Sequence, residues 1–372
     1  MRMIAALLIV FVAGCASAPQ DIIGRVDEDA ATLTARGATV VDVFVATTRA
    51  PLEDANLLFS GERGTDLSFA KVSVSIPPNH QPGQIERPKS SVPNPDTEFA
   101  LLPPTVFASP SALVGSLNRA LAAQPTDERD VLIFVHGYNT DLTSAILRTA
   151  QFAHDVNYPG VPVLFSWASA GRTLDYLYDL NSALHARDAL LQTGNILSTS
   201  RAEGFNVLAH SMGTLVTVEA MRQAVLEGNG RPPEGFRVKN VVLAAPDIDL
   251  DLFRKQLDVL PTTDIPIYIL TASDDRALAL SGSLARGGRV GAADVEDLTD
   301  LGVIVIDLSE VSDRDRAAHT KFANAPSVIR VLGEGLRAGN SLETRTDDGF
   351  RVLQRVGAAG RVVAGGAAVV VD

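Results

Sequence analysis

From Asp130 onward, short and wholly apolar segments alternate with longer stretches of helical periodicity, and this alternation strongly constrains the fold. The apolar segments are Val131–Val135, Val161–Trp167, Phe205–Ala209, Val238–Ala245, Ile265–Thr271 and Val303–Leu308. Because they are apolar throughout, and not only at alternate positions, we expect parallel strands that are buried on both faces. The helical stretches are residues 141–156, 173–199, 212–227, 249–258 and 314–337. This βαβ alternation predicts a doubly wound, mostly parallel α/β sheet.

The preceding residues predict an amino-terminal strand extension of the same domain. Two strand-like runs, Val40–Thr47 and Leu67–Ile76, are followed by the proline-rich residues 77–104, for which we expect an irregular loop. The composition then suggests the following divisions along the chain. They are a signal segment at 1–15, a mobile tether at 16–38, a domain at 39–338 (an extension at 39–129 and a core at 130–338), and a weakly ordered tail at 339–372.

The chain begins with the features of a bacterial export signal. Arg2 precedes the apolar run Ile4–Ala13, which is too short to span a bilayer. The run leads into Cys15, the only cysteine, in a context that resembles a lipoprotein lipobox, and the thiol would accept a diacylglyceryl group. Ala16 resembles the residue that sorts such proteins to the outer membrane. We therefore expect a lipid anchor at Cys15 that holds the protein in the cell envelope, on the outer membrane facing the periplasm. The alternative is a plain secretory signal.

Composition argues against several classes of partner. The net charge of −12 and the pI near 5.0 disfavour nucleic acid. Neither a phosphate-binding G-x-x-x-x-G-K nor a G-x-G-x-x-G after a strand occurs. The six histidines are scattered without the spacing of metal ligands. We accordingly expect no cofactor, no metal and no nucleic-acid partner.

One apolar run ends in a motif that is typical of a catalytic serine. Phe205–Ala209 is followed by His210-Ser211-Met212-Gly213 and then by a helical stretch. The order of strand, tight turn and helix is that of the nucleophile elbow, G-x-S-x-G, with Ala209 in place of the first glycine. A serine hydroxyl needs such a turn, because it is a poor nucleophile unless it is held beside a base and oxyanion donors. Ser211 is therefore the candidate nucleophile.

A second strand ends where an oxyanion loop is needed. Val131–Val135 is followed by His136-Gly137-Tyr138-Asn139. In hydrolases with a nucleophile elbow, this loop supplies one backbone N–H to the oxyanion hole, and the residue after the nucleophile supplies the other. The predicted donors are the N–H groups of Tyr138 (or Gly137) and Met212. His136 and His210 are interpreted as framework residues of the loop and the elbow.

The acid and the base follow the nucleophile in chain order. Asp274 and Asp275 come directly after the strand Ile265–Thr271, and we choose Asp275 by its position relative to the strand end. Asp247 is a competitor, and the alternative role for each of these carboxylates is that of a helix N-cap, which acids at strand ends often fill. The base is identified by elimination, because only His319 lies downstream of the acid. The other histidines are His80, His136, His154, His185 and His210.

Residues Val40 to Leu332 resemble a bacterial family of uncharacterised α/β-hydrolase-fold proteins with an extended amino-terminal segment. The matching pieces are Val43–Arg49, Phe59–Gly64, Val74–His80, Phe134–Asn139, Leu164–Trp167, Leu208–Gly213, Ala244–Asp247 and Ser273–Leu278. The resemblance implies the fold and the nucleophile, but no substrate. Two positions depart from the family pattern. Asp274 stands where a neutral residue is usual, and Ala318 stands where a glycine usually precedes the histidine.

These features together predict a lipid-anchored serine hydrolase, most simply a carboxylesterase or lipase-like acyl hydrolase acting on a small acyl ester. An amidase or peptidase is the alternative within the enzymes, because a triad does not encode the leaving group. A binding or scaffolding lipoprotein without turnover is the alternative from another class. Only about twenty residues separate Ala245 from Ile265, which is too few for a large cap domain. We therefore expect a fairly open site that favours short or medium acyl chains.

Overall fold

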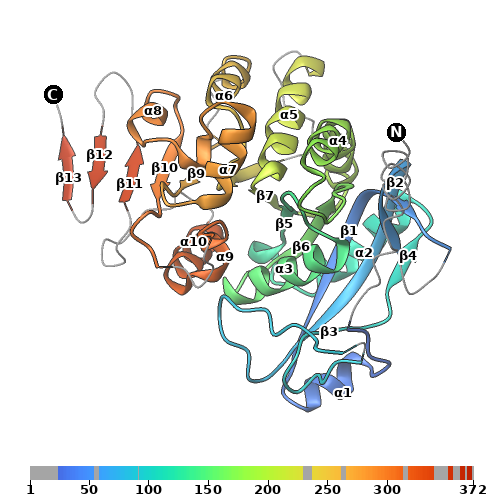
Figure 1. Cartoon of the computed structure of the whole chain (residues 1–372). Coiled ribbons are helices and arrows are strands. Elements are labelled where there is room, and N and C mark those ends of the chain that lie inside the picture. The colour runs from blue at the N-terminus through green and yellow to red at the C-terminus, as the bar shows by residue number, and fades with distance from the viewer. Residues whose placement is uncertain are drawn as a thin grey trace, which may run out of the picture.

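The computed structural model describes residues 24–53, 58–90, 92–228, 237–260, 265–312, 317–338, 351–354, 361–364 and 367–370. A single sheet runs through the molecule, with helices on both of its faces (Figure 1). The predicted signal segment and Cys15 lie outside the described residues. Among the residues that are described, no helix combines the length and the apolar character needed to cross a bilayer.

The central strands confirm the predicted doubly wound sheet. They are β1 (Thr39–Pro51), β2 (Phe59–Ile76), β5 (Asp130–Val135), β6 (Val161–Ser166), β7 (Gly204–His210), β8 (Val238–Ala244), β9 (Ile267–Thr271) and β10 (Ile304–Asp307). Their order across the sheet is β10-β9-β8-β7-β5-β6-β1-β2. Neighbours from β10 to β1 pair in parallel, and only β2 returns antiparallel to β1. The carboxyl ends of the parallel strands therefore meet at one edge, where α/β folds place their ligands.

Helices cover both faces of the sheet and bury a separate core on each. The main helices are α2 (Pro110–Ala122), α3 (Leu142–Asp155), α4 (Tyr176–Leu197), α5 (Met212–Glu227), α6 (Leu250–Leu257), α7 (Arg276–Ala285), α9 (Lys321–Asn324) and α10 (Pro326–Ala338). Along β5, Leu132 and Phe134 join the core under α3 and α10, whereas Val131, Ile133 and Val135 join the core under α4 and α5. Each such side chain contributes roughly 1.5–3 kcal/mol on burial. This two-sided burial is why the strand is apolar at every position.

The carboxyl-terminal helical region is divided where the sequence predicts one continuous stretch. We expect a helix over residues 314–337, but the structure has the short α9 followed by α10, and residues 317–320 precede α9 as a non-helical segment. Pro326 begins α10 and holds Ala325 in an extended conformation. His319 therefore lies on a loop, as a general base requires.

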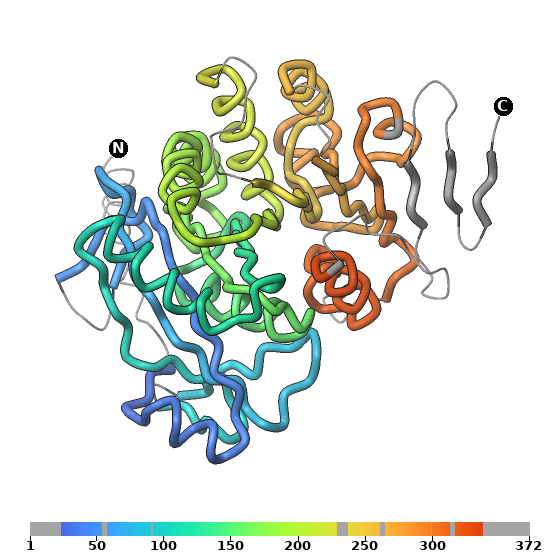
Figure 2. The backbone as a smooth tube through the Cα atoms, turned by 180° about the vertical axis from the view of Figure 1, so that it is seen from behind, coloured from blue at the N-terminus to red at the C-terminus, as the bar shows by residue number. Residues whose placement is uncertain are grey.

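The amino-terminal segment is packed where the sequence predicts a mobile tether. Within the expected tether of residues 16–38, residues 24–38 carry α1 (Ala30–Ala35), and Leu33 is buried. Val26 N–H donates to the Leu101 carbonyl at 2.9 Å, and Arg36 pairs with Glu28 and Asp96. Figure 2 shows the segments from α1 to α2 gathered at one end of the molecule. A tether can therefore comprise only residues before Gly24.

The edges of the sheet carry short additional strands. β3 (Ala100–Leu101) and β4 (Thr105–Phe107) pair with β2. At the other edge, β11 (Arg351–Gln354), β12 (Arg361–Ala364) and β13 (Ala367–Val370) follow β10 in antiparallel order. The last three strands lie in residues 339–372, for which the sequence predicts a weakly ordered tail.

Candidate active site

Ser211 occupies a strained turn between β7 and α5. Its backbone has φ 53° and ψ −125°, a conformation that costs a non-glycine residue on the order of 1–3 kcal/mol. The Ser211 N–H donates to the Ala244 carbonyl at 2.9 Å, which ties the turn to β8. A Cβ on Gly213 would lie 2.3 Å from the carbonyl oxygen of His136, so only glycine lets α5 approach β5 this closely. The turn therefore has the backbone of a nucleophile elbow.

Asp275 and His319 form a buried carboxylate–imidazole pair. The Nδ1–H of His319 donates to Asp275 Oδ2 at 2.7 Å, and the Asp275 side chain is 0% exposed. The other oxygen, Oδ1, accepts from the Leu278 N–H at 3.0 Å and caps α7. The carboxylate is thus both a helix N-cap and a partner of the imidazole. With Nδ1 engaged, Nε2 is the nitrogen of His319 that is left to accept a proton.

The loop that carries His319 is held against the elbow. The Nε2–H of His210 donates to the His319 carbonyl at 3.0 Å, and the two rings lie 4.7 Å apart. Burial and the neighbouring His319 lower the pKa of His210 well below its usual range, so His210 is neutral. The Arg276 N–H donates to the Ala317 carbonyl at 2.9 Å. These bonds fix the backbone on both sides of His319 and bring it beside the residue that precedes Ser211.

The two competing carboxylates have other partners. Both carboxylate oxygens of Asp274 accept from Lys321 Nζ, at 2.7 and 2.8 Å. The Asp274 side chain is about half exposed. Asp247 is buried, accepts from Ser281 Oγ at 2.8 Å and from the Tyr176 hydroxyl at 3.1 Å, and lies 3.1 Å from Arg289 Nε. Neither carboxylate is paired with His319. The geometry therefore favours Asp275 as the acid.

The predicted oxyanion loop lies against the nucleophile. A Cβ placed on Gly137 would lie 2.8 Å from the Cβ of Ser211, which shows how closely the loop approaches it. His136 Nδ1–H donates to the carbonyl of Gly137 at 2.9 Å. In a trans peptide the next N–H points the opposite way, so this bond fixes the direction of the Tyr138 N–H. Met212, the other predicted donor, is the first residue of α5.

Arg49 joins β1 to this loop through the ring of His136. Arg49 is fully buried, its Nε donates to Ser166 Oγ at 2.8 Å, and its terminal nitrogens donate to the carbonyls of Ser169 at 2.9 Å and Thr140 at 2.7 Å. Ser166 Oγ in turn lies 3.2 Å from His136 Nε2, to which its hydroxyl hydrogen can point. Nε2 also lies 3.2 Å from the Trp167 carbonyl. The shorter contact of Nδ1 with the Gly137 carbonyl, together with the Ser166 hydroxyl at Nε2, favours the tautomer of His136 that carries its proton on Nδ1.

Burial and the Arg49 charge shape the titration of this network. Burial, followed by the nearby Arg49, lowers the pKa of His136 to about 3, so the ring is neutral at physiological pH. Burial lowers the pKa of Arg49 to about 10, with Asp141 and Asp179 opposing that shift. Arg49 therefore stays charged. The network that orients the Gly137 carbonyl does not change protonation near neutral pH.

Asp179 supports the far side of the same loop. Its Oδ2 accepts from Ser169 Oγ at 2.6 Å and from the Asn139 N–H at 3.1 Å, and Asn139 has a positive φ of 54°. Burial raises the pKa of Asp179. Sequence reasoning missed both Arg49 and Asp179. The signal available for Arg49 is a charged residue just beyond the predicted strand Val40–Thr47, at a position that the structure places within β1. Its carbonyl partners at Thr140 and Ser169 lie 91 and 120 residues away.

Ala318, one of the two departures from the family pattern, has a left-handed backbone. Its φ is 57°, a conformation that glycine adopts without strain. We expect Ala318→Gly to leave the free energy of unfolding within about 1 kcal/mol of wild type, because relief of strain and added freedom of the unfolded chain oppose one another. Urea denaturation measures the change. A loss above about 2 kcal/mol would contradict a strained Ala318.

The chain resembles solved esterases at low identity. Esterase B from Lactobacillus rhamnosis is 12% identical, with 84% of this chain and 91% of that chain covered and a TM-score of 0.37. A fungal esterase from Rhizomucor miehei is 14% identical, with 83% and 87% covered and a TM-score of 0.39. An esterase from Pyrobaculum calidifontis is 12% identical, with 83% and 89% covered and a TM-score of 0.34. At these values the likenesses carry no argument about activity.

The family of the chain is shown by its sequence. No curated protein matches it. Residues 111–335, more than half of the chain, match the model of a family described as "Alpha/beta hydrolase of unknown function (DUF900)". That range includes the elbow, the oxyanion loop, Asp275 and His319. With its mostly parallel sheet flanked by helices, the protein has the α/β-hydrolase fold and belongs to this family.

Proposed function

We propose that the protein is a serine hydrolase in which Ser211, His319 and Asp275 form the catalytic triad. Nε2 of His319 takes the hydroxyl proton while Ser211 Oγ attacks the acyl carbonyl. Asp275 holds the imidazole through Nδ1 and stabilises the imidazolium. The imidazolium then returns the proton to the leaving group, and water repeats the sequence on the acyl-enzyme. The observation that carries the proposal is the 2.7 Å Asp275–His319 pair, which is held against His210, the residue that precedes the strained Ser211.

The oxyanion of the tetrahedral intermediate is assigned to two backbone donors. They are the N–H of Met212, at the start of α5, and the N–H of Tyr138 or, in its place, of Gly137. The N-terminus of α5 adds the positive end of a 16-residue helix to the same place. Such donors act by being fixed in direction before the reaction, and the bond from His136 to the Gly137 carbonyl supplies that fixation.

We assign the substrate to esters with short or medium acyl chains. Between β8 and β9 the structure describes only the eight-residue α6, so no cap domain roofs a long acyl tunnel there. Ser211 itself is only 3% exposed, which is less open than the sequence predicts. The rings of Tyr138 and Tyr176 meet edge to face at 5.3 Å, and the Tyr176 hydroxyl binds Asp247, whose N–H contacts the Ser211 carbonyl. Aromatic side chains therefore restrict the space near the nucleophile.

The experiment is a comparison of leaving groups and acyl lengths. Purified protein is assayed with p-nitrophenyl esters of graded chain length and with matched p-nitroanilides, and Ser211→Ala serves as the blank. We expect the short and medium esters to be cleaved fastest. Faster anilide cleavage would identify an amidase or peptidase. A sharp rate increase above the micelle threshold of long-chain esters would contradict the assigned chain length.

We also propose that Cys15 is lipidated and that the enzyme is anchored in the cell envelope. The support is the lipobox-like context of Cys15 after the apolar run Ile4–Ala13. We expect Cys15→Ser to move the protein from the membrane fraction to the soluble periplasmic fraction, or to leave it uncleaved, without changing kcat. Fractionation of the envelope measures this. Unchanged membrane attachment of a correctly cleaved Cys15→Ser protein would rule the anchor out.

A further inference from the structure

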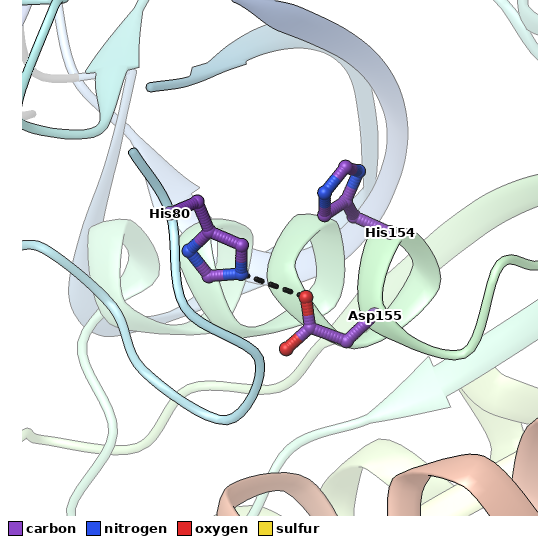
Figure 3. A group of neighbouring side chains, drawn as sticks. All are labelled: His80, His154 and Asp155. Carbon is purple, nitrogen blue, oxygen red and sulfur yellow. Dashed lines mark hydrogen bonds and ion pairs between the residues drawn. The ribbon is translucent and has the colours of Figure 1, made fainter. Parts of the chain in front are cut away.

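We propose that His80, His154 and Asp155 form a binding site for Zn²⁺. His80 lies on the loop after β2, and His154 and Asp155 are the last residues of α3 (Figure 3). One ligand atom from each residue can be chosen so that all three atoms lie within 4.8 Å of one another. Two imidazole nitrogens and a carboxylate oxygen are a donor set that suits zinc, with water as a fourth ligand. His80 and Asp155 are 75 residues apart in sequence, so no spacing motif indicates the site.

A carboxylate on the far side of its ring already orients His80. Nδ1 lies 2.8 Å from Glu86 Oε2, and Nε2 lies 2.7 Å from Asp155 Oδ1. Metal-binding histidines usually give their second nitrogen to a carboxylate, which fixes the ring and makes the ligand nitrogen more basic. Glu86 occupies that position. Figure 3 shows the ring of His80 turned toward Asp155, with Nε2 directed at the carboxylate.

The second ligand, Asp155, is equally well fixed. Its Oδ2 accepts from the Gly83 N–H and from Gln151 Nε2, both at 2.6 Å. These bonds occupy one oxygen and leave Oδ1 facing His80. The side chains of Asp155 and His80 are 0% and 5% exposed, so a metal bound between them would be shielded from bulk solvent, apart from the water that serves as its fourth ligand. The ring of His154 meets that of His80 edge to face at 5.4 Å.

The His80–Asp155 pair needs only a small movement to admit the ion, and the His154 nitrogen lies within 4.8 Å of the other two ligand atoms. Zn–N and Zn–O bonds of about 2.0–2.2 Å at a tetrahedral angle place two ligand atoms roughly 3.3 Å apart. Nε2 and Oδ1 are now 2.7 Å apart with a proton between them. Zn²⁺ would displace that proton, and the two groups would separate by roughly half an ångström.

The site is structural and lies far from the nucleophile. The oxyanion loop precedes the N-terminus of α3, and 14 helical residues extend about 20 Å to His154 and Asp155. The loop after β2, which carries His80, packs closely against α9, because a Cβ on Gly83 would lie 2.2 Å from the Asn324 carbonyl oxygen. Zinc would therefore connect the β2 loop to α3, and the loop in turn packs against α9. Its predicted effect is on stability, and it does not depend on the serine chemistry.

The experiment titrates Zn²⁺ into the full chain. The protein carries no histidine tag and has first been freed of bound metal with a chelator. Isothermal titration calorimetry is expected to give one site with a micromolar or tighter dissociation constant, and Tm is expected to rise with added Zn²⁺. Co²⁺ is expected to give the intense visible absorption of a tetrahedral site. His154→Ala should weaken binding by at least about tenfold. His185→Ala, which removes an exposed histidine of α4, should bind as wild type does.

Two results would overturn the proposal. One is the absence of saturable Zn²⁺ and Co²⁺ binding by the folded wild-type chain. The other is unchanged zinc affinity in folded His154→Ala. If His154→Ala does not fold, the Co²⁺ spectrum of the wild type decides, because octahedral absorption alone would exclude this ligand set. Esterase activity is not measured in this experiment, so the zinc proposal and the triad proposal are tested independently of one another.

Discussion

Replacing His319 with alanine is expected to lower kcat for a p-nitrophenyl ester by roughly four to six orders of magnitude. Without the imidazole, Ser211 loses the group that is assigned to accept its proton and to return it to the leaving group. Asp275 Oδ2 also loses its partner in a buried site, so we expect a stability loss of about 1–3 kcal/mol. Steady-state kinetics and thermal unfolding measure the two effects separately. His185→Ala is the control and should retain wild-type kcat.

The same assay identifies the acid. Asp275→Asn is expected to lower kcat by roughly 10⁴, because the amide would favour the wrong tautomer of His319. Asp274→Asn should change kcat by less than about tenfold, since the partner of Asp274 is Lys321. Asp247→Asn should reduce stability more than kcat, because it disturbs the buried contacts with Ser281 and Arg289. A harmless Asp275→Asn together with a crippling change at either other aspartate would show that the acid is misassigned.

Arg49→Lys is expected to lower kcat by roughly 10²–10³ with little change in KM. Lysine keeps the charge but lacks the planar set of donors that contacts Ser166, Ser169 and Thr140 at once. Without the bond to Ser166, the tautomer of His136 is no longer selected, and the Gly137 peptide is free to rotate its N–H away from the oxyanion. The loss is therefore predicted in kcat, which reports the chemical step, and not in the binding of the substrate. Arg63→Lys, which changes an arginine stacked on Tyr178, is the control.

A second variant separates positioning from folding. Ser166→Ala removes the link between Arg49 and His136 with a small change in volume, and we expect kcat to fall about tenfold with a native unfolding temperature. Because the pKa of His136 is held near 3, the midpoint of the pH–rate profile between pH 5 and 9 should not move. Wild-type kcat in folded Arg49→Lys and Ser166→Ala would contradict the role assigned to the network.

The sequence predicts the parallel part of the sheet well because strands such as β5, β6 and β7 are buried on both faces. A segment such as Val131–Val135 has no polar position to mistake for an exposed face, and β5 begins and ends within a residue of it. The helix α7 was not predicted, because Arg276–Ala285 mixes alanine, leucine, serine and glycine without a clear polar face. The packing of residues 24–38 was missed because its few apolar side chains, such as Leu33, are buried in a small cluster that the distant Ala100 and Leu102 complete.

The residues of the candidate site also fall into two groups, those that the sequence indicates and those that it does not. Ser211 and His319 follow from local context and chain order, which a sequence displays directly. The choice among Asp247, Asp274 and Asp275 depends on which carboxylate the folded chain turns toward His319, and adjacent residues at a strand end do not reveal this. Arg49 acts through partners on other elements of the fold. The sequence shows such a residue only as a charge near the end of a predicted strand, with no indication of its partners.

Covalent labelling with a fluorophosphonate tests the central claim most directly. The probe reacts only with a serine activated by a base and an oxyanion hole, so it reports the assembled site without knowledge of the substrate. Tandem mass spectrometry of the labelled wild-type protein is predicted to place a single modification on Ser211, and folded Ser211→Ala is predicted to remain unlabelled while Ser283→Ala labels fully. A native wild-type protein that takes up no probe, or a label that persists in Ser211→Ala, would contradict the account.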